Sequence, residues 1–304
     1  MALILVSGLI NIETTLQIDS FPLNYTPVCY PFFGVNGSVS GVGYNVTKAL
    51  AMLGHEVHFT SLIGRDIAAQ QVRSALIDIP VSDEHVLNAI NHTPQSVILH
   101  DRNGRRQIHV DLKDIQQQTY PDEVFERAMA GCDLFALCNI NFSRRFLQKA
   151  RLTGKPIATD VHAIAQLDDE YNLDFMRAAH ILFMSDERLP LPPEDWAREV
   201  LQAYAPEVVV IGLGAQGALL AIRNENVMQR IPAVTTRPIV NTIGAGDALF
   251  SAFLHSYLHS GNPYSAIRRA VVFASYKIGS TSAAEGFLNR DALERMCTER
   301  QIDP

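Results

Sequence analysis

The chain has 304 residues and a formal net charge of −7, from 25 Lys and Arg residues against 32 Asp and Glu residues. Hydrophobic residues make up 47% and charged residues 19%, a composition that builds a packed core and excludes long disorder. The acidic balance argues against a nucleic-acid backbone as the main partner, because binding one needs clustered positive charge. The length suits one large α/β domain.

The N-terminal residues and the cysteines indicate where the protein resides. The first apolar run ends at Asn11 and the first basic residue is Lys48, so the positively charged start of a signal peptide is not expected. No stretch approaches the ~20 apolar residues of a membrane span. The 4 cysteines form no C-x-x-C pair, which predicts reduced thiols. We therefore expect a soluble, cytoplasmic protein without a membrane partner.

Short apolar runs alternate with amphipathic stretches along the chain. One helix is predicted around Val46 and ends at Gly54, and a second runs from Pro121 to Gly131. A third is predicted from Ser143, which would be its N-cap, to Gly154. Strand–helix repetition of this kind predicts a doubly wound, mostly parallel sheet in three α/β/α layers. The runs that read as buried strands are 3–6, 57–63, 134–138, 157–159, 181–184 and 208–211.

Two segments interrupt this rhythm. Residues 10–19 alternate between apolar and polar, as in a half-exposed strand, and 95–99 and 107–110 flank Asn103-Gly104, a type I′ hairpin signal. They suggest a small β-sheet that stands off the main body and covers a ligand, a partner subunit or both. The alternative is a set of extra edge strands of the main sheet. Arg105 and Arg106 after the turn serve either hairpin solubility or contact with a substrate anion.

A glycine pattern follows the predicted strand 208–211. Gly212, Gly214 and Gly217 fit G-x-G-x-x-G, but a dinucleotide fold needs a helix next and an acidic residue about 20 positions on. The following 218–222 reads as a strand, and no acid lies near Pro232. The pattern therefore disfavours an NAD(P)-dependent oxidoreductase and favours a tight loop, whose backbone can still approach a nucleotide.

A second glycine-containing run opens an amphipathic helix at 241–247. The N–H groups of Gly244, Ala245 and Gly246 are expected to point unpaired from the helix N-terminus, which suits a phosphate. Asp247 lies in the first turn. It either stabilises the helix dipole or, beside a bound phosphate, accepts the proton of an attacking hydroxyl.

The run Asn241-Thr-Ile-Gly-Ala-Gly-Asp247 resembles the D-T-x-G-A-G-D signature of the ribokinase-like (PfkB) family of sugar and nucleoside kinases. Ser40-Gly-Val-Gly-Tyr-Asn45 is similar to the family's G-G-x-G-x-N element, and 212–217 to its nucleotide-contacting L-G-x-x-G loop. The resemblance spans nearly the full length. It implies a single ribokinase-like domain over residues 1–304, with lid segments near 10–38 and 95–112 that also join two copies into a homodimer.

The same resemblance implies an ATP-dependent kinase that phosphorylates a primary hydroxyl. Asp247 would be its catalytic base, with Gly244, Ala245 and Gly246 as the anion hole. The residues expected to contact the phosphate acceptor are Asn11, Glu13, Gly41, Gly43, Asn45 and Asn139. Those expected beside ATP are Gly212, Gly214, Gly217, Thr242 and Ala274. Mg²⁺ would bridge the phosphates, and some relatives hold a monovalent cation such as K⁺ near Asn241, Thr242 and 280–285.

Several departures from the family pattern affect these expectations. Asn241 replaces the first Asp of the signature and removes a charge, which weakens the K⁺ prediction. The metal-linked N-x-x-E element is absent at 185–188, so Asp186 or Glu187 would hold the metal's water, unless both lie in a solvated turn. Glu13 replaces an Asp. Together with Asn139 and the G-V-G-x-N form, it favours a nucleoside or a modified sugar over ribose.

A second class of function keeps the fold without the chemistry. A sugar- or nucleoside-binding regulator would bind the same small molecule and lose turnover. The intact 244–247 run argues against it.

Overall fold

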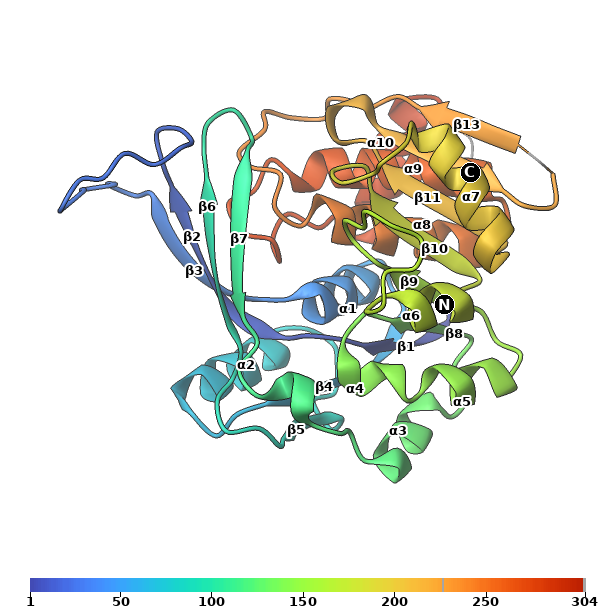
Figure 1. Cartoon of the computed structure of the whole chain (residues 1–304), viewed down its shortest axis with the longest axis horizontal. Coiled ribbons are helices and arrows are strands. Elements are labelled where there is room, and N and C mark those ends of the chain that lie inside the picture. The colour runs from blue at the N-terminus through green and yellow to red at the C-terminus, as the bar shows by residue number, and fades with distance from the viewer. Residues whose placement is uncertain (226, 303–304) are drawn as a thin grey trace.

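The computed structural model describes residues 1–225 and 227–302 and is built on a nine-stranded sheet of order β13-β12-β11-β10-β9-β8-β1-β4-β5 (Figure 1). Neighbouring strands from β11 to β5 are parallel, and β12 and β13 add an antiparallel edge. The strands are β1 (Leu3–Ser7), β4 (Glu56–Ile63), β5 (Val86–Asn88), β8 (Leu134–Leu137), β9 (Ile157–Asp160), β10 (Ile181–Ser185), β11 (Val208–Gly212), β12 (Ala218–Ile222) and β13 (Val227–Ile231).

Helices cover both faces of this sheet and bury two separate apolar clusters. Alternate side chains of one strand enter opposite clusters: Ile4 and Val6 of β1 join one, and Leu5 joins the other. The first cluster packs under α1 (Val42–Met52), α2 (Ile67–Ile77), α8 (Ala245–Ser260), α9 (Pro263–Lys277) and α10 (Arg290–Glu299). The second packs under α3 (Asp122–Met129), α4 (Asn141–Arg144), α5 (Leu147–Leu152), α6 (Leu173–Ala178) and α7 (Pro193–Tyr204). The predicted three-layer α/β/α fold is confirmed.

The strand order places a topological switch point at the centre of the main sheet. From β1 the chain continues to β4 on one side, and it later returns to β8 on the other, so the winding direction reverses between β1 and β8. In open α/β sheets ligands bind at such a switch point, outside the carboxyl ends of the strands. No helix in the described ranges is long and apolar enough to span a membrane.

The two segments that interrupt the strand–helix repetition form a separate four-stranded sheet beside the main body (Figure 1). Its strand order is β3-β2-β6-β7. Its strands are β2 (Asn11–Gln17), β3 (Val35–Ser40), β6 (Gln95–His100) and β7 (Arg106–Asp111). The alternative of extra edge strands on the main sheet is therefore wrong. On β2 the polar Asn11, Glu13 and Thr15 are buried, and Ile12 and Leu16 are only half-buried. The polar face is covered because it is turned toward the main domain.

Two local predictions are wrong. The hairpin turn is not type I′: Gly104 N donates to Asp101 O and only Gly104 has a positive φ, because the Asp101 carboxylate already accepts from the N–H groups of Asn103 and Arg105. Ser143 is not an N-cap. It lies inside the short helix α4, and its hydroxyl is hydrogen-bonded to Ser7 on β1.

Candidate active site

The N-terminus of α8 begins with a glycine that no other residue could replace. Gly244 is the N-cap with φ +74°, and a Cβ there would lie 2.7 Å from Ala283 O. The tight turn makes Ala245 N donate to Thr242 O at 3.2 Å, so the expectation of an unpaired Ala245 N–H is wrong. The N–H groups of Gly244 and Gly246 donate no hydrogen bond to the described part of the chain. A Cβ on Gly246 would lie 3.8 Å from Asp160 Oδ2, an ordinary van der Waals distance, so no close contact requires glycine at this position.

The carboxylate of Asp247 lies one residue further along the same turn. Its side chain is buried, 8% exposed for the residue, and Oδ2 accepts a 2.7 Å hydrogen bond from Asn45 Nδ2 on α1. Burial raises the pKa of Asp247, and the hydrogen bond from Asn45 is the largest of the influences that lower it. Asn45 thus fixes one carboxylate oxygen and leaves the other available beside the helix N-terminus.

A chain of hydrogen bonds continues from Asn45 into the small sheet. Ser40 Oγ, at the end of β3, lies 3.3 Å from Asn45 Oδ1 and 2.9 Å from Glu13 Oε2 on β2. Glu13 Oε1 in turn accepts from Ala283 N at 3.4 Å. Residues from β2, β3, α1, α8 and the 280–286 loop are therefore held in one network. Sequence reasoning did not name Ser40 as a site residue. The available signal was its position in the motif, since it takes the place of the first glycine in the family's G-G-x-G-x-N element.

Asn11 offers an unused acceptor beside this network. Its Nδ2 donates to Ser96 Oγ at 2.9 Å, but its buried Oδ1 has no partner among the described residues. Gly41 and Gly43 bring the start of α1 against the β1–β2 turn. A Cβ on Gly41 (φ +103°) would lie 2.6 Å from Leu9 O and 3.1 Å from Asn11 Oδ1, and one on Gly43 would lie 2.5 Å from the carbonyl carbon of Gly8.

Asn139 follows β8, the strand next to β1. Its Nδ2 donates to Asn172 Oδ1 at 2.9 Å and its carbonyl accepts from Tyr171 Oη at 2.8 Å. Within the described chain it has no hydrogen bond to Asp247 or its neighbours. Its contact with a substrate therefore remains a prediction.

The glycine loop after β11 forms a short 3₁₀ turn, η2 (Gly214–Gln216), between two strands. Because the antiparallel β12 and β13 follow instead of a helix, the dinucleotide-binding interpretation is excluded. Gly217 (φ +97°) is required by packing, since a Cβ would lie 2.0 Å from Ile231 O. A Cβ on Gly212 would make only ordinary van der Waals contacts, the nearest with Met184 O at 3.8 Å. Ala274 is half-buried on α9 and packs against the first apolar cluster.

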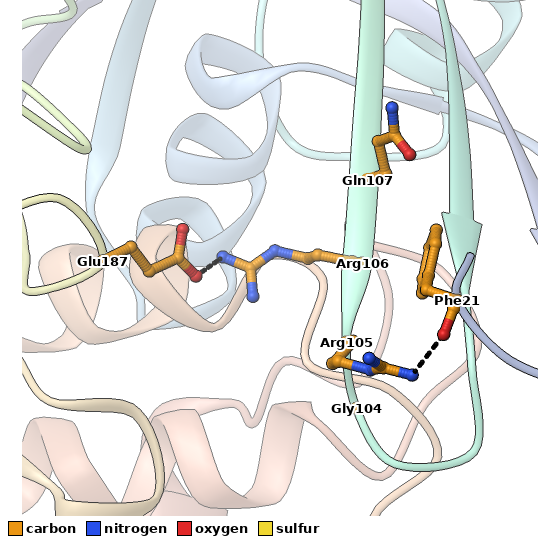
Figure 2. A pocket seen from close by; sticks show the side chains of 6 residues that line it. All are labelled: Phe21, Gly104, Arg105, Arg106, Gln107 and Glu187. Atoms are coloured by element: carbon orange, nitrogen blue, oxygen red, sulfur yellow. Dashed lines mark hydrogen bonds and ion pairs between the residues drawn. The ribbon is translucent and has the colours of Figure 1, made fainter.

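A cavity of about 500 Å³ opens between the small sheet and the main domain, and Figure 2 shows its lining residues. Arg106 extends across it from β7, donating to Glu187 Oε1 at 2.9 Å and to Thr242 Oγ1 at 3.3 Å. Thr242 Oγ1 also donates to Gly104 O at 3.3 Å, so the hairpin tip lies against the loop that precedes α8. Arg105 instead pairs with Asp101 inside its own hairpin.

The two acids predicted to face a metal lie after β10. Burial raises the pKa of Asp186, whereas the Glu187 carboxylate is engaged by Arg106. No group of three or more His, Cys, Asp or Glu side chains suited to a metal ion occurs among residues 1–225 and 227–302.

Sequence reasoning missed Lys277 at the end of α9. Its side chain is fully buried and its ammonium donates to Ile243 O, one residue before the N-cap of α8. Burial lowers the pKa of Lys277 to about 8, and the carboxylates of Asp247 and Glu13 act in the opposite direction. A lysine in an apolar stretch that leads into the 280–286 loop was the available signal.

Comparison with known proteins gives the family. The model of the pfkB family carbohydrate kinases matches residues 1–290. The chain belongs to the pfkB family. A deoxyribokinase of Salmonella typhi is 36% identical over 252 residues, covering 78% of this chain and 80% of the relative. Acarbose 7(IV)-phosphotransferase of Actinoplanes sp. is 23% identical over 297 residues, covering 96% and 97%.

Solved structures agree on the fold of this pfkB member. A microbiome-derived acarbose kinase superposes with a TM-score of 0.87 at 22% identity, covering 98% of this chain and 99% of the other. The Burkholderia thailandensis nucleoside kinase in complex with inosine gives a TM-score of 0.79 at 16% identity, covering both chains completely (100% and 100%). The chain is thus a pfkB-family sugar or nucleoside kinase, a phosphotransferase that acts on an alcohol group.

Proposed function

We propose that this kinase transfers the γ-phosphoryl group of ATP to a primary hydroxyl of a sugar or nucleoside, with Asp247 as general base. The observation that carries the proposal is the position of Asp247. Its buried carboxylate is oriented by Asn45 in the first turn of α8, beside the unpaired N–H groups of Gly244 and Gly246. A carboxylate beside an anion site is repelled by phosphate, so its presence there favours a chemical role.

In the proposed reaction the acceptor oxygen attacks the γ-phosphorus and forms the new P–O bond. The bond from phosphorus to the bridging oxygen of ADP breaks, and the acceptor proton passes to Asp247. Phosphoryl transfer has a loose transition state, so the protein mainly positions groups and stabilises charge. The N–H groups of Gly244 and Gly246 supply that charge stabilisation, with the positive end of the α8 dipole behind them.

The nucleotide would lie along the loops after β10 and β11, bordered by Gly212, Gly214, Gly217, Thr242 and Ala274. Glycine at 212, 214 and 246 supports this fit, because the backbone can approach a phosphate closely where no Cβ intervenes. Mg²⁺ would neutralise charge on the phosphates, with Asp186 and Glu187 as the nearby acids. Asp186 is the better placed, since the Glu187 carboxylate is shared with Arg106.

The acceptor would bind against the polar face of the small sheet, which acts as a lid. Asn11 Oδ1 has no partner and can accept from a hydroxyl, and Glu13 can hold a second one. Gly41, Gly43 and Asn45 would complete this side, with Asn139 at its rim. The pfkB relatives include a deoxyribokinase and a nucleoside kinase complexed with inosine. We expect a nucleoside or a modified sugar rather than free ribose.

Replacement of the base tests the mechanism. Asp247→Ala is expected to lower kcat by ~10²–10⁴-fold while the protein stays folded, because general-base catalysis contributes about that factor. The matched control is Asp195→Ala, an exposed first-turn acid of α7, which should keep wild-type turnover. ADP release and circular dichroism of both variants provide the measurement. Near-wild-type turnover in folded Asp247→Ala would refute Asp247 as the base.

An acceptor panel separates the kinase from a binding regulator of the same fold. ADP release from ATP and Mg²⁺ is measured with ribose, deoxyribose, acarbose, inosine and other nucleosides, beside thermal unfolding with each compound. Turnover stimulated by an acceptor supports the kinase. Thermal stabilisation by an acceptor without any turnover would instead support the regulator.

We also propose a homodimer that forms through the small sheet. The connection between β2 and β3 projects away from the main body (Figure 1) and exposes aromatic side chains, with Phe32 84% and Phe33 102% exposed. Val35 and Val97 add exposed apolar surface on the outer face of the same sheet. A second copy of the chain would cover these exposed apolar side chains, and such clusters often mark protein–protein contact sites.

A further inference from the structure

The oxygen atoms near Asn241, where some relatives hold a monovalent cation, already have donors from the protein. The buried Asn241 Nδ2 donates to Ser280 O at 3.1 Å and to Thr281 O at 2.9 Å. Its Oδ1 accepts from Ile243 N at 3.0 Å, which fixes the orientation of the amide. The Asn241 amide therefore joins the loop before α8 to the 280–286 loop. It does so through carbonyl groups that a cation would otherwise coordinate.

The ammonium of Lys277 takes up a further oxygen of the same two loops. It donates to Ile243 O, the carbonyl immediately before the left-handed Gly244 that begins α8. Gly244 in turn lies against Ala283, since a Cβ there would be 2.7 Å from the Ala283 carbonyl oxygen. The loop that carries the anion hole is thus held from behind by one buried cation.

The ammonium compensates part of the negative charge around this point. The carboxylates of Asp247 and Glu13 are both buried and interact electrostatically with Lys277, as does Glu285. An uncompensated buried carboxylate is costly, so a positive charge is needed between them. The covalently attached ammonium supplies it, whereas a dissociable cation would have to be bound from solution.

We propose that Lys277, together with the Asn241 amide, replaces a monovalent cation, so that this enzyme works without K⁺. Lys277 is a positioning residue: its ammonium holds the Ile243 carbonyl and thereby the turn from which the N–H groups of Gly244 and Gly246 point. The structural part of the inference stands on the contacts alone. Its catalytic part rests on the proposed kinase reaction.

The first experiment compares cations for the wild-type chain. The rate of ADP release and the midpoint of thermal unfolding are measured in KCl, NaCl and choline chloride at equal ionic strength. Both are expected to agree among the three salts, the rates within about twofold, because no cation binds the loops. A several-fold stimulation by K⁺, or an unfolding midpoint raised by K⁺ alone, would overturn the inference.

The second experiment removes the internal cation. Lys277→Ala is expected to lose at least ~10-fold in kcat, and ammonium or K⁺ should recover part of it by entering the vacated space. Its unfolding midpoint should now rise with K⁺. Lys155→Ala, an exposed lysine far from the site, is the control and should show neither effect. A folded Lys277→Ala with wild-type kcat in choline chloride would contradict the role of Lys277.

A third variant restores the aspartate of the family signature at Asn241, the other donor to these carbonyl groups. Asn241→Asp places a carboxylate against Ser280 O and Thr281 O, so it should make the unfolding midpoint depend on K⁺; an Asn241→Asp chain indifferent to K⁺ would count against the inference. The unfolding readouts need no acceptor. If no compound is phosphorylated in any salt, the proposed function fails, while the salt dependence of unfolding still decides whether Lys277 and Asn241 replace a cation.

Discussion

At the scale of single residues, burial shifts the pKa values of the two carboxylic acids and of the lysine of this site in opposite directions. It raises the pKa of Asp247 and of Glu13, and it lowers the pKa of Lys277 to about 8. In each case burial disfavours the charged form. Hydrogen bonds and opposite charges act against this effect of burial, and Asn45 and Ser40 provide these hydrogen bonds for the two acids.

These shifts predict the pH dependence of turnover. In the proposed reaction Asp247 is deprotonated and Lys277 is protonated, so we expect kcat to fall toward acid pH and again above about pH 8. The groups that act on Lys277 are Glu13, Asp247, Glu285 and Arg237. Kinetics across pH 5–10 measure both limbs of the profile.

At alkaline pH, a loss of turnover can be distinguished from a loss of fold. The pKa of Lys277 is lower in the folded chain than its ordinary 10.5, so between about 8 and 10.5 the unfolded chain binds more protons. The contribution of this group to stability therefore rises with pH there, and the loss of kcat should not follow a loss of fold. Lys277→Arg stays charged and should move the limb upward. A folded Arg variant with an unchanged limb near pH 8 would contradict the assignment.

At the scale of elements, the small sheet is attached to the main domain by polar contacts and by a small apolar cluster in which Ile98 on β6 meets Ile243 and Ala283. Glu13 on β2 and Ser38 on β3 reach Ala283 and Ser282 of the 280–286 loop, and Arg106 on β7 reaches Glu187. An exposed ion pair such as Arg106–Glu187 contributes only ~0–1 kcal/mol, so these contacts position the sheet more than they stabilise it. This attachment is consistent with the lid role that we propose for the small sheet.

The loop between β11 and β12 allows a test of packing against backbone strain. Gly217→Ala adds both a positive φ penalty and a Cβ 2.0 Å from Ile231 O, whereas Gly54→Ala, at φ +88°, meets nothing within 4 Å. We expect Gly54→Ala to cost ~1 kcal/mol of unfolding free energy and Gly217→Ala clearly more, because backbone must shift. Denaturant unfolding of the two variants measures the difference. Equal costs would show that the close contact at Gly217 relaxes freely.

At the scale of the whole molecule, the small sheet and its β2–β3 connection expose several large apolar side chains. The homodimer proposed from this surface predicts a sedimentation mass of twice 33.6 kDa. Phe32→Ser combined with Phe33→Ser should shift the mass toward the monomer, because it removes apolar area from the interface. Ile77→Ser, an exposed apolar residue on α2, is the control. A monomeric wild-type chain at micromolar concentration would refute the dimer.

The sequence alone was sufficient for the features that depend on neighbouring residues. Apolar runs predicted the buried strands, because parallel strands covered on both faces need apolar side chains throughout. The 241–247 run identified the glycines and the acid at the start of α8, and alternation identified β2 as a strand of a second sheet. The family resemblance followed from the order of such local motifs.

Only the tertiary structure decided how these parts meet. Asn45 reaches Asp247 across 202 positions, and Glu13 reaches Ala283 across 270, so no local pattern records either contact. The polar face of β2 is the buried one because the main domain covers it, which alternation cannot tell. Lys277 and Asn241 show the same limit. The Lys277 ammonium and the Asn241 amide act by donating hydrogen bonds to backbone carbonyl groups of other loops. Only folding brings those carbonyl groups within hydrogen-bonding distance.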